Sequence, residues 1–179
     1  MLWTGELRLP LLSAKFMLNP DSRYKAAEAA KLIERTPVDV ARLGQIVTPE
    51  IPANGKGYRA FYSFRNLVEM RLAEELGKFG IPQKRIEKMI EELRKTKCRW
   101  LDLDGRDGVV VLDRNWKFAA GDTIDLALRS ISVNTPVTSA MVVDLGIIKR
   151  AIRRNMEQNE VETEIYPNTT EGEILNVGK

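Results

Sequence analysis

Residues that favour helix ends divide the first half of this 179-residue chain into short segments. Thr36 followed by Pro37 predicts a helix start, because a hydroxyl can cap the first turn and proline fits its first position. Ser63 and Pro82 predict two further starts, and Gly80 predicts a helix end between them. Together with apolar residues at helical spacing, these signals predict four helices, over residues 24–33, 37–45, 63–79 and 82–95.

A β-hairpin is expected between the second and third of these helices. Residues 46–62 place apolar and aromatic side chains on both sides of a turn-rich centre, Asn54 to Gly57. Two short helices joined by a turn and followed by such a wing are typical of a winged helix-turn-helix. Many small helical domains contain a similar helix pair in their core, so the pair alone also fits a purely structural role.

The second half of the chain is expected to be richer in strands. Apolar runs separated by Asp-Gly and Asn turns predict a small antiparallel sheet, with strands at residues 100–103, 109–112, 116–118, 123–129 and 130–133. Farther along, Val142 and Val143 favour a strand, whereas Leu145, Ile148 and Ile152 are spaced as on one face of a helix. We therefore predict a short strand that passes into a helix near Leu145.

The two ends of the chain are expected to differ from each other. Residues 1–22 are predicted to form an arm with paired strands, because charged residues and a proline make them unsuitable as a secretion signal or membrane span. The last 23 residues hold six glutamates against one lysine, which predicts a solvated, flexible acidic tail. The expected organisation is α+β, with the arm at 1–22, a winged helix-turn-helix at 23–97, a small β-rich region ending in a helix at 98–156, and the tail at 157–179.

Composition argues against several kinds of chemistry. The chain has no histidine, which removes the commonest metal ligand and the usual general base near neutral pH. Its single cysteine, Cys98, cannot form an intramolecular disulfide, which favours a cytoplasmic location. Lys and Arg outnumber Asp and Glu by 18 to 12 in residues 1–97, but are outnumbered by 13 to 10 in the remainder. An anionic partner is therefore expected at the basic first half.

An enzyme is the function class with the least support. The acidic stretch from Asp102 to Gly108 superficially suggests a calcium loop, but the later glutamate of an EF-hand is missing, and two Asp-Gly turns explain it better. Cys98 has no histidine partner and lies at the end of a predicted helix rather than at its start, so a catalytic thiolate is not indicated. We expect no enzymatic activity, no cofactor and no metal.

Several spaced motifs add to the helix-turn-helix pattern. Tyr24 opens the alanine-rich first helix, Thr36-Pro37 opens the second, and Val47-Thr48-Pro49 follows it. Gly57-Tyr58-Arg59-Ala60-Phe61-Tyr62-Ser63 spans the wing and the next helix start, and Gly80-Ile81-Pro82 joins the last two helices. In order and spacing, these motifs between residues 24 and 95 resemble the DNA-binding domain of the MerR family of bacterial regulators.

The resemblance implies a transcriptional regulator that binds specific double-stranded DNA as a homodimer. A looser similarity to MerR-type antitoxins of VapB-like systems implies an alternative, in which residues 98–179 hold a protein partner and DNA binding serves autoregulation. The chain departs from the family in residues 38–45, where the family usually has arginines and aromatic residues but this chain has one arginine, Arg42, and no aromatic residue. It also lacks the long coiled coil that normally pairs two subunits. A dimer interface is therefore expected in the sheet of residues 100–133 or on the apolar face of residues 141–156.

Candidate contacts to DNA fall into two groups. The second helix would meet base edges in the major groove through Thr36, Val38, Asp39, Arg42 and Gln45. The wing and the third helix would meet phosphates through Lys56, Tyr58, Arg59, Tyr62 and Arg65, with Lys25, Lys84 and Arg85 at the rim. Arg42 suits guanine and Gln45 suits adenine, whereas Asp39 suits either cytosine or the helix dipole. The alternatives remain that Val38 and Val40 pack in the core and that the charges are only solvated.

Overall fold

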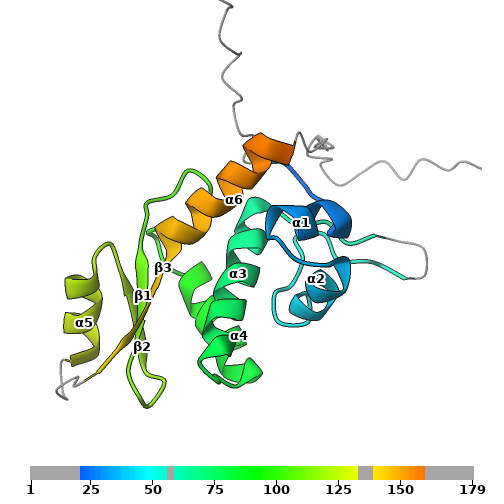
Figure 1. The fold of residues 1–179 in the computed structure, drawn as a ribbon. Coiled ribbons are helices and arrows are strands. Elements are labelled where there is room, and N and C mark those ends of the chain that lie inside the picture. The colour runs from blue at the N-terminus through cyan, green and yellow to red at the C-terminus, as the bar shows by residue number, and fades with distance from the viewer. Residues whose placement is uncertain (1–20, 56–58, 133–138, 160–179) are drawn as a thin grey trace, which may run out of the picture.

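The computed structural model describes residues 21–55, 59–132 and 139–159. Within these ranges the chain is a mixed α/β protein, as the predicted α+β class requires, with six helices and one three-stranded antiparallel sheet. The first two helices lie at one end of the molecule and the sheet lies at the other (Figure 1). The predictions for the arm up to residue 20, for Lys56 and Tyr58, and for the tail from residue 160 fall outside the described residues.

The four helices predicted for the first half are confirmed. They are α1 (Ala26–Leu32), α2 (Pro37–Leu43), α3 (Phe64–Lys78) and α4 (Gln83–Arg94). The side chain of Thr36 accepts a hydrogen bond from the amide of Asp39 at 3.2 Å, and that of Ser63 accepts one from the amide of Asn66 at 3.3 Å. Gly80 follows α3 with a φ of 75°, a left-handed conformation that glycine adopts without strain. The predicted boundary residues therefore act as caps and helix ends.

The three strands form a sheet that is covered on both faces. In the order β2-β1-β3, they are β2 (Phe118–Gly121), β1 (Val109–Leu112) and β3 (Met141–Asp144), all antiparallel to their neighbours. Alternate residues of β1 face opposite sides, so that Val109 and Val111 pack with the helix α5 (Ile124–Ser132) while Val110 and Leu112 join the main core. The sheet therefore separates α5 from the other helices (Figure 1).

The two strands predicted between residues 123 and 133 are wrong, because α5 occupies this stretch as far as it is described. The carbonyl of Thr123 accepts a hydrogen bond from the amide of Ala127 at 3.1 Å, which closes the first helical turn. Ala127 and Ile131, four residues apart, are both buried against the sheet. The alternating residues that favoured a strand include Ile124 and Leu126, whose side chains are 47% and 51% exposed. The helical spacing of the buried residues Ala127 and Ile131 therefore determines the structure of this stretch.

Two further strand predictions differ from the structure. Residues 100–103 form turns instead of a strand, because Arg99 has a φ of 52° and its carbonyl accepts a hydrogen bond from the amide of Asp102 at 3.0 Å. The strand predicted at residues 116–118 is present as β2 but starts two residues later. Trp116 has a φ of 60° and belongs to the turn between β1 and β2.

The prediction of a strand that passes into a helix near Leu145 is confirmed. The last strand, β3, ends at Asp144, and α6 (Leu145–Asn159) begins at the next residue. The apolar face of α6 packs into the same core as α1 and α3. Asn155 donates a hydrogen bond to the carbonyl of Leu32 at 2.9 Å, which ties the end of α6 to α1. The two halves of the chain therefore share one hydrophobic core.

Tyr24 lies fully buried in this shared core. Its backbone exchanges hydrogen bonds of 2.8 and 2.9 Å with Tyr62, and its hydroxyl lies 4.0 Å from the sulfur of Met156. Burial disfavours the phenolate and raises the pKa of Tyr24 to about 12. The neutral form of this side chain is therefore part of the folded state.

We expect Tyr24→Phe to make the protein less sensitive to alkali. An unfolded tyrosine titrates near pH 10, so the buried phenol contributes its full stability below that pH and loses it as the pH rises toward 12. The loss at about pH 11 should be near 1 kcal/mol larger in the unmodified protein than in the variant, which keeps the other tyrosines. Urea unfolding of both proteins at neutral and alkaline pH measures the difference. An equal alkaline loss in both would contradict the expectation.

Candidate nucleic-acid interface

The short helix α2 has one buried side and one exposed side. Val40 and Leu43 are buried in the core, which for Val40 is the packing role considered above. Val38 is 77% exposed, and Arg42, four residues later on the same helix face, is exposed as well. Gln45 is exposed just beyond the end of the helix. With Thr36, which is exposed as well, four of the five residues predicted to contact bases are presented to solvent.

Two residues of that group, Thr36 and Asp39, form the start of α2. The Asp39 carboxylate accepts hydrogen bonds from the Thr36 hydroxyl at 2.7 Å and the Thr36 amide at 3.3 Å, and these bonds lower the pKa of Asp39. Arg42 donates to the same carboxylate at 3.2 Å, although its side chain is 72% exposed. Asp39 thus has the capping role, and it holds one edge of the Arg42 guanidinium while the rest of that group faces solvent.

The predicted wing is described only in its arms. Ile51 and Phe61 exchange backbone hydrogen bonds of 3.2 and 2.9 Å, which pairs the arms antiparallel, and Gly55 has a φ of 99° where the chain begins to turn. Arg59 is exposed on the returning arm. The arms project from the molecule at the end where α2 lies (Figure 1). The exposed residues of α2 and Arg59 therefore belong to the same end of the protein.

Tyr62 does not lie on the surface, contrary to its expected contact with phosphate. It is only 4% exposed, and burial raises the pKa of its hydroxyl. A Cβ atom at Gly44 would lie 3.2 Å from that hydroxyl, so the tyrosine end abuts the last turn of α2. Tyr62 therefore fixes the wing against α2 from inside, and the spacing of the sequence motif did not distinguish this role from a surface contact.

Arg65 and the rim residues have varied surroundings. Arg65, in the first turn of α3, is 47% exposed and donates from Nε to the Asp102 carboxylate at 2.6 Å. Lys84 is exposed and Lys25 is half-buried, whereas Arg85 donates to the carbonyl of Trp116 at 2.8 Å. Arg65 therefore faces the second half of the chain, away from the exposed residues of α2.

A buried polar network, which the sequence patterns did not reveal, holds the base of the wing. The Asn66 amide accepts from the backbone N–H of Glu50 at 2.9 Å and donates to the carbonyl of Thr48 at 3.2 Å. It also donates to Glu69, which is 0% exposed and accepts two hydrogen bonds of 2.6 Å from Arg94. Loop, α3 and α4 are thus joined by bonds that fix where the wing leaves the core.

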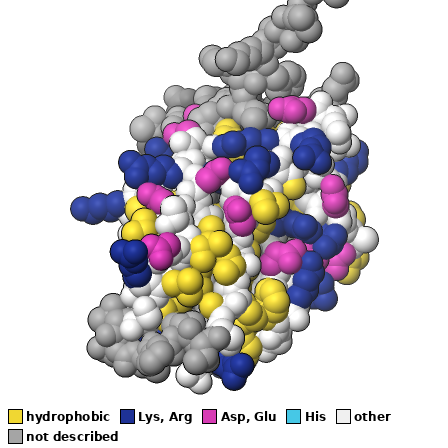
Figure 2. Space-filling model, turned by 60° about the vertical axis from the view of Figure 1, so that its left-hand side comes forward, with side chains coloured by type: hydrophobic (Ala, Val, Ile, Leu, Met, Phe, Trp, Pro, Cys, Tyr) yellow, Lys and Arg dark blue, Asp and Glu magenta, His cyan; other side chains and the backbone are white. Residues whose placement is uncertain are grey.

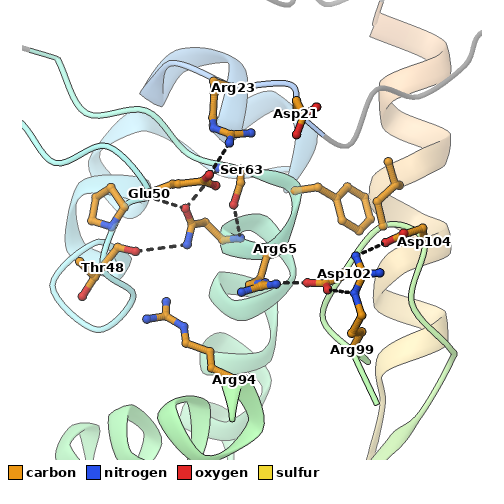
Figure 3. A pocket seen from close by; sticks show the side chains of 14 residues that line it. Asp21, Arg23, Thr48, Glu50, Ser63, Arg65, Arg94, Arg99, Asp102 and Asp104 are labelled. Atoms are coloured by element: carbon orange, nitrogen blue, oxygen red, sulfur yellow. Dashed lines mark hydrogen bonds and ion pairs between the residues drawn. The ribbon is translucent and has the colours of Figure 1, made fainter. Parts of the chain in front are cut away.

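Next to this network lies a polar cavity of about 480 Å³ (Figure 3). Its lining includes four arginines from four segments of the chain, Arg23, Arg65, Arg94 and Arg99. Arg23 pairs with Glu50, and both Arg65 and Arg99 pair with Asp102, whose pKa they hold below its usual value although burial opposes this. The cavity lies between the first turn of α3 and the loop of residues 99–104, on the boundary of the two halves.

No protein-family model matches this chain, and no curated protein matches it significantly. Within the described ranges, no helix combines the length and apolar character needed to cross a bilayer. In the same part of the chain, no three acidic or cysteine side chains gather as potential ligands of a metal ion.

Proposed function

We propose that this protein is a sequence-specific double-stranded DNA-binding regulator of the MerR-like type, acting as a homodimer. The observation that carries the proposal is the exposed face of α2, where Val38 and Arg42 face solvent while Val40 and Leu43 anchor the helix from behind. An α-helix presented in this way has the width that the major groove of B-DNA accepts. The neighbouring arms of residues 51–61 then serve as the wing.

The chemistry of the exposed residues supports a division of labour. Arg42 has a planar guanidinium that can bond two acceptors of guanine, and Gln45 can do the same with adenine. Arg59, on the wing, is suited to phosphate, which positions the protein without reading sequence. Val38, at 77% exposure, costs free energy in water and offers an apolar contact to a thymine methyl group. The interface would thus combine base recognition on α2 with backbone contact on the wing.

We expect Arg42→Ala and Arg59→Ala to affect DNA binding differently. Genomic fragments retained by the purified protein first supply the cognate duplex. Arg42→Ala should then lower the preference for cognate over random duplex by about 5- to 150-fold, because it removes a base contact. Arg59→Ala should weaken binding to both duplexes similarly and reduce the slope of log affinity against log salt by about one. Fluorescence anisotropy over a range of salt concentrations measures both effects.

Arg129→Ala is the matched control for these variants. Arg129 is an exposed arginine on α5, where it pairs with Asp125 at the opposite end of the molecule from α2. Its removal changes the net charge as much as the other two substitutions do, and should leave the cognate preference unchanged. If all three variants behave alike, or if neither duplex is bound, then α2 and the wing are not a DNA-reading surface.

The dimer in this proposal needs a surface other than the apolar face of α6, which the core already buries. Among the described residues of the second half, the large apolar side chains that remain exposed belong to α5, β3 and the first turn of α6; they are Ile124, Leu126, Val142 and Ile147. Figure 2, in which the α5 side comes forward, shows apolar side chains gathered between charged ones. Two DNA-binding units on two half-sites require a second copy, so we place the copy's contact here.

Light scattering coupled to size-exclusion chromatography tests the dimer. The chain should run with twice its monomer mass, and Ile147→Asp should shift it to the monomer, because a charge on a buried interface costs more free energy than a small contact supplies. Ile124→Asp provides a second variant on another element. A wild-type chain that runs as a monomer would instead favour the alternative proposal, an antitoxin or adaptor whose residues 98–179 bind a different protein.

A further inference from the structure

We propose that the cavity between α3 and the loop of residues 99–104 binds the phosphate group of a small phosphorylated molecule. The proposal does not depend on DNA binding. Its basis is the ion-pair cluster on one wall, in which Asp102 lies between Arg65 and Arg99 at 2.6 and 2.7 Å (Figure 3). Two guanidiniums share the Asp102 carboxylate there, and Arg99 also bonds the Asp104 carboxylate at 2.8 Å, so the cluster as a whole is neutral.

Exposure within the cluster is uneven in a way that suits an incoming anion. The Asp102 side chain is only 9% exposed, whereas Arg65 and Arg99 are 47% and 59% exposed. The Asp102 charge is therefore behind, and the two guanidiniums are in front together with the exposed Asp104 carboxylate. A guanidinium has five N–H donors, yet among the described residues Arg65 donates only through Nε. The remaining donors can bond phosphate oxygens, for which arginine geometry is well suited.

The cavity lining as a whole is balanced, with four arginines and four acidic residues, one of which is Asp21, so the preference for phosphate rests on exposed guanidinium donors and not on net charge. Arg23 and Glu50 pair with each other, and Arg94 is held by the buried Glu69. Asp104 is the carboxylate that competes with a ligand, because it bonds Arg99 at 2.8 Å, but at 57% exposure it can turn into solvent. The cavity volume of about 480 Å³ lies within the range of small-molecule sites in proteins.

The wall that holds Asp102 is fixed from below. Lys149, 0% exposed in α6, donates to the carbonyls of Gly105 and Arg106 at 2.9 Å each. Arg153, one turn later in α6, donates to the carbonyl of Leu103. This loop therefore has a defined conformation before any ligand arrives, and the entropic cost of ordering it on binding is reduced.

Isothermal titration calorimetry with pyrophosphate tests the site, with potassium chloride adjusted to keep the ionic strength constant. We expect saturable binding to the full chain, at least tenfold weaker in Arg65→Gln/Arg99→Gln. Asp104→Asn should bind about threefold more tightly, since it removes the competing charge and leaves both arginines in place. A purely structural role of these arginines would not produce that gain. Arg129→Gln, which alters a distant arginine, should bind as the unmodified protein does.

Three results would overturn the proposal. The first is no saturable heat at millimolar pyrophosphate with the unmodified protein. The second is equal affinity in the double variant, confirmed as folded by circular dichroism, because the binding would then lie elsewhere. The third is loss of DNA binding in the double variant without any pyrophosphate binding to the parent, which would assign the cavity to the phosphate backbone of DNA. DNA binding through Arg42 is measured in a separate experiment. A failure to bind DNA would therefore not change the interpretation of the pyrophosphate titration.

Discussion

Glu69→Ala is expected to lower the free energy of unfolding by about 3 kcal/mol. The Glu69 carboxylate is fully buried and accepts two hydrogen bonds of 2.6 Å from Arg94 and one of 3.2 Å from Asn66. Its removal leaves a partly buried guanidinium without its partner and an amide donor unsatisfied. Because the Asn66 amide also holds the backbone at Thr48 and Glu50, the base of the wing should loosen together with the core.

Urea unfolding followed by circular dichroism gives the magnitude, and Glu75→Ala is the control. Glu75 lies on the same helix and pairs with Lys78 at 2.7 Å, but both side chains are partly solvated. Such a pair contributes less than about 1 kcal/mol. Hydrogen exchange at the amide of Glu50, which bonds to Asn66, reports separately on the wing. Equal losses in the two variants would contradict the role assigned to the buried carboxylate.

Lys149→Met should also lower the free energy of unfolding by about 3 kcal/mol. The ammonium group is buried in α6 and has bonds to the carbonyls of Gly105 and Arg106 and to the Asp107 carboxylate at 3.2 Å. Methionine fills a similar volume but donates nothing, so both carbonyl groups lose their partner, and the Asp107 carboxylate loses the buried ammonium. Each buried acceptor left without a donor costs about 1–3 kcal/mol.

The neighbouring Arg150→Met provides a close control for that variant. Arg150 pairs with the same carboxylate, Asp107, at 2.9 Å, but is 55% exposed. Its loss should cost less than about 1 kcal/mol, because water replaces the partner. Thermal and urea unfolding of both variants measure the contrast. If Arg150→Met proves as damaging as Lys149→Met, the carbonyl contacts of the buried ammonium are not what stabilises the loop.

The sequence predicted best those elements whose ends carry their own chemical signals. Thr36 and Ser63 cap with their own side chains and Gly80 tolerates a left-handed backbone, so the boundaries of α2 and α3 follow from local residues. The change from β3 to α6 was also predictable, because the apolar period changes near Leu145. By contrast, α5 was predicted as strands, because the alternation of Ile124, Leu126 and Leu128 has the period of a strand.

The polar contacts of the candidate site were harder to predict. The burial of Glu69 was not predicted, because nothing local to it indicates that Arg94, 25 residues later, covers it. Tyr62 belongs to a motif suited to DNA contact, yet its orientation depends on packing against Gly44. The exposure of Val38 and Arg42 did follow from helical spacing, because burial of Val40 and Leu43 orients the rest of α2. Local patterns thus located the surface but not the groups that hold it.

The bond from Asn155 to Leu32 spans 123 residues of chain, and the contact between Tyr24 and Met156 spans 132. On the ribosome, the N-terminal helices emerge long before the helix that covers them. Their apolar faces therefore stay open to water, or to chaperones, until α6 has been synthesised. A chain cut after α4 would lack that cover, so we expect a nascent chain halted there to remain sensitive to protease, although its own helix signals are complete.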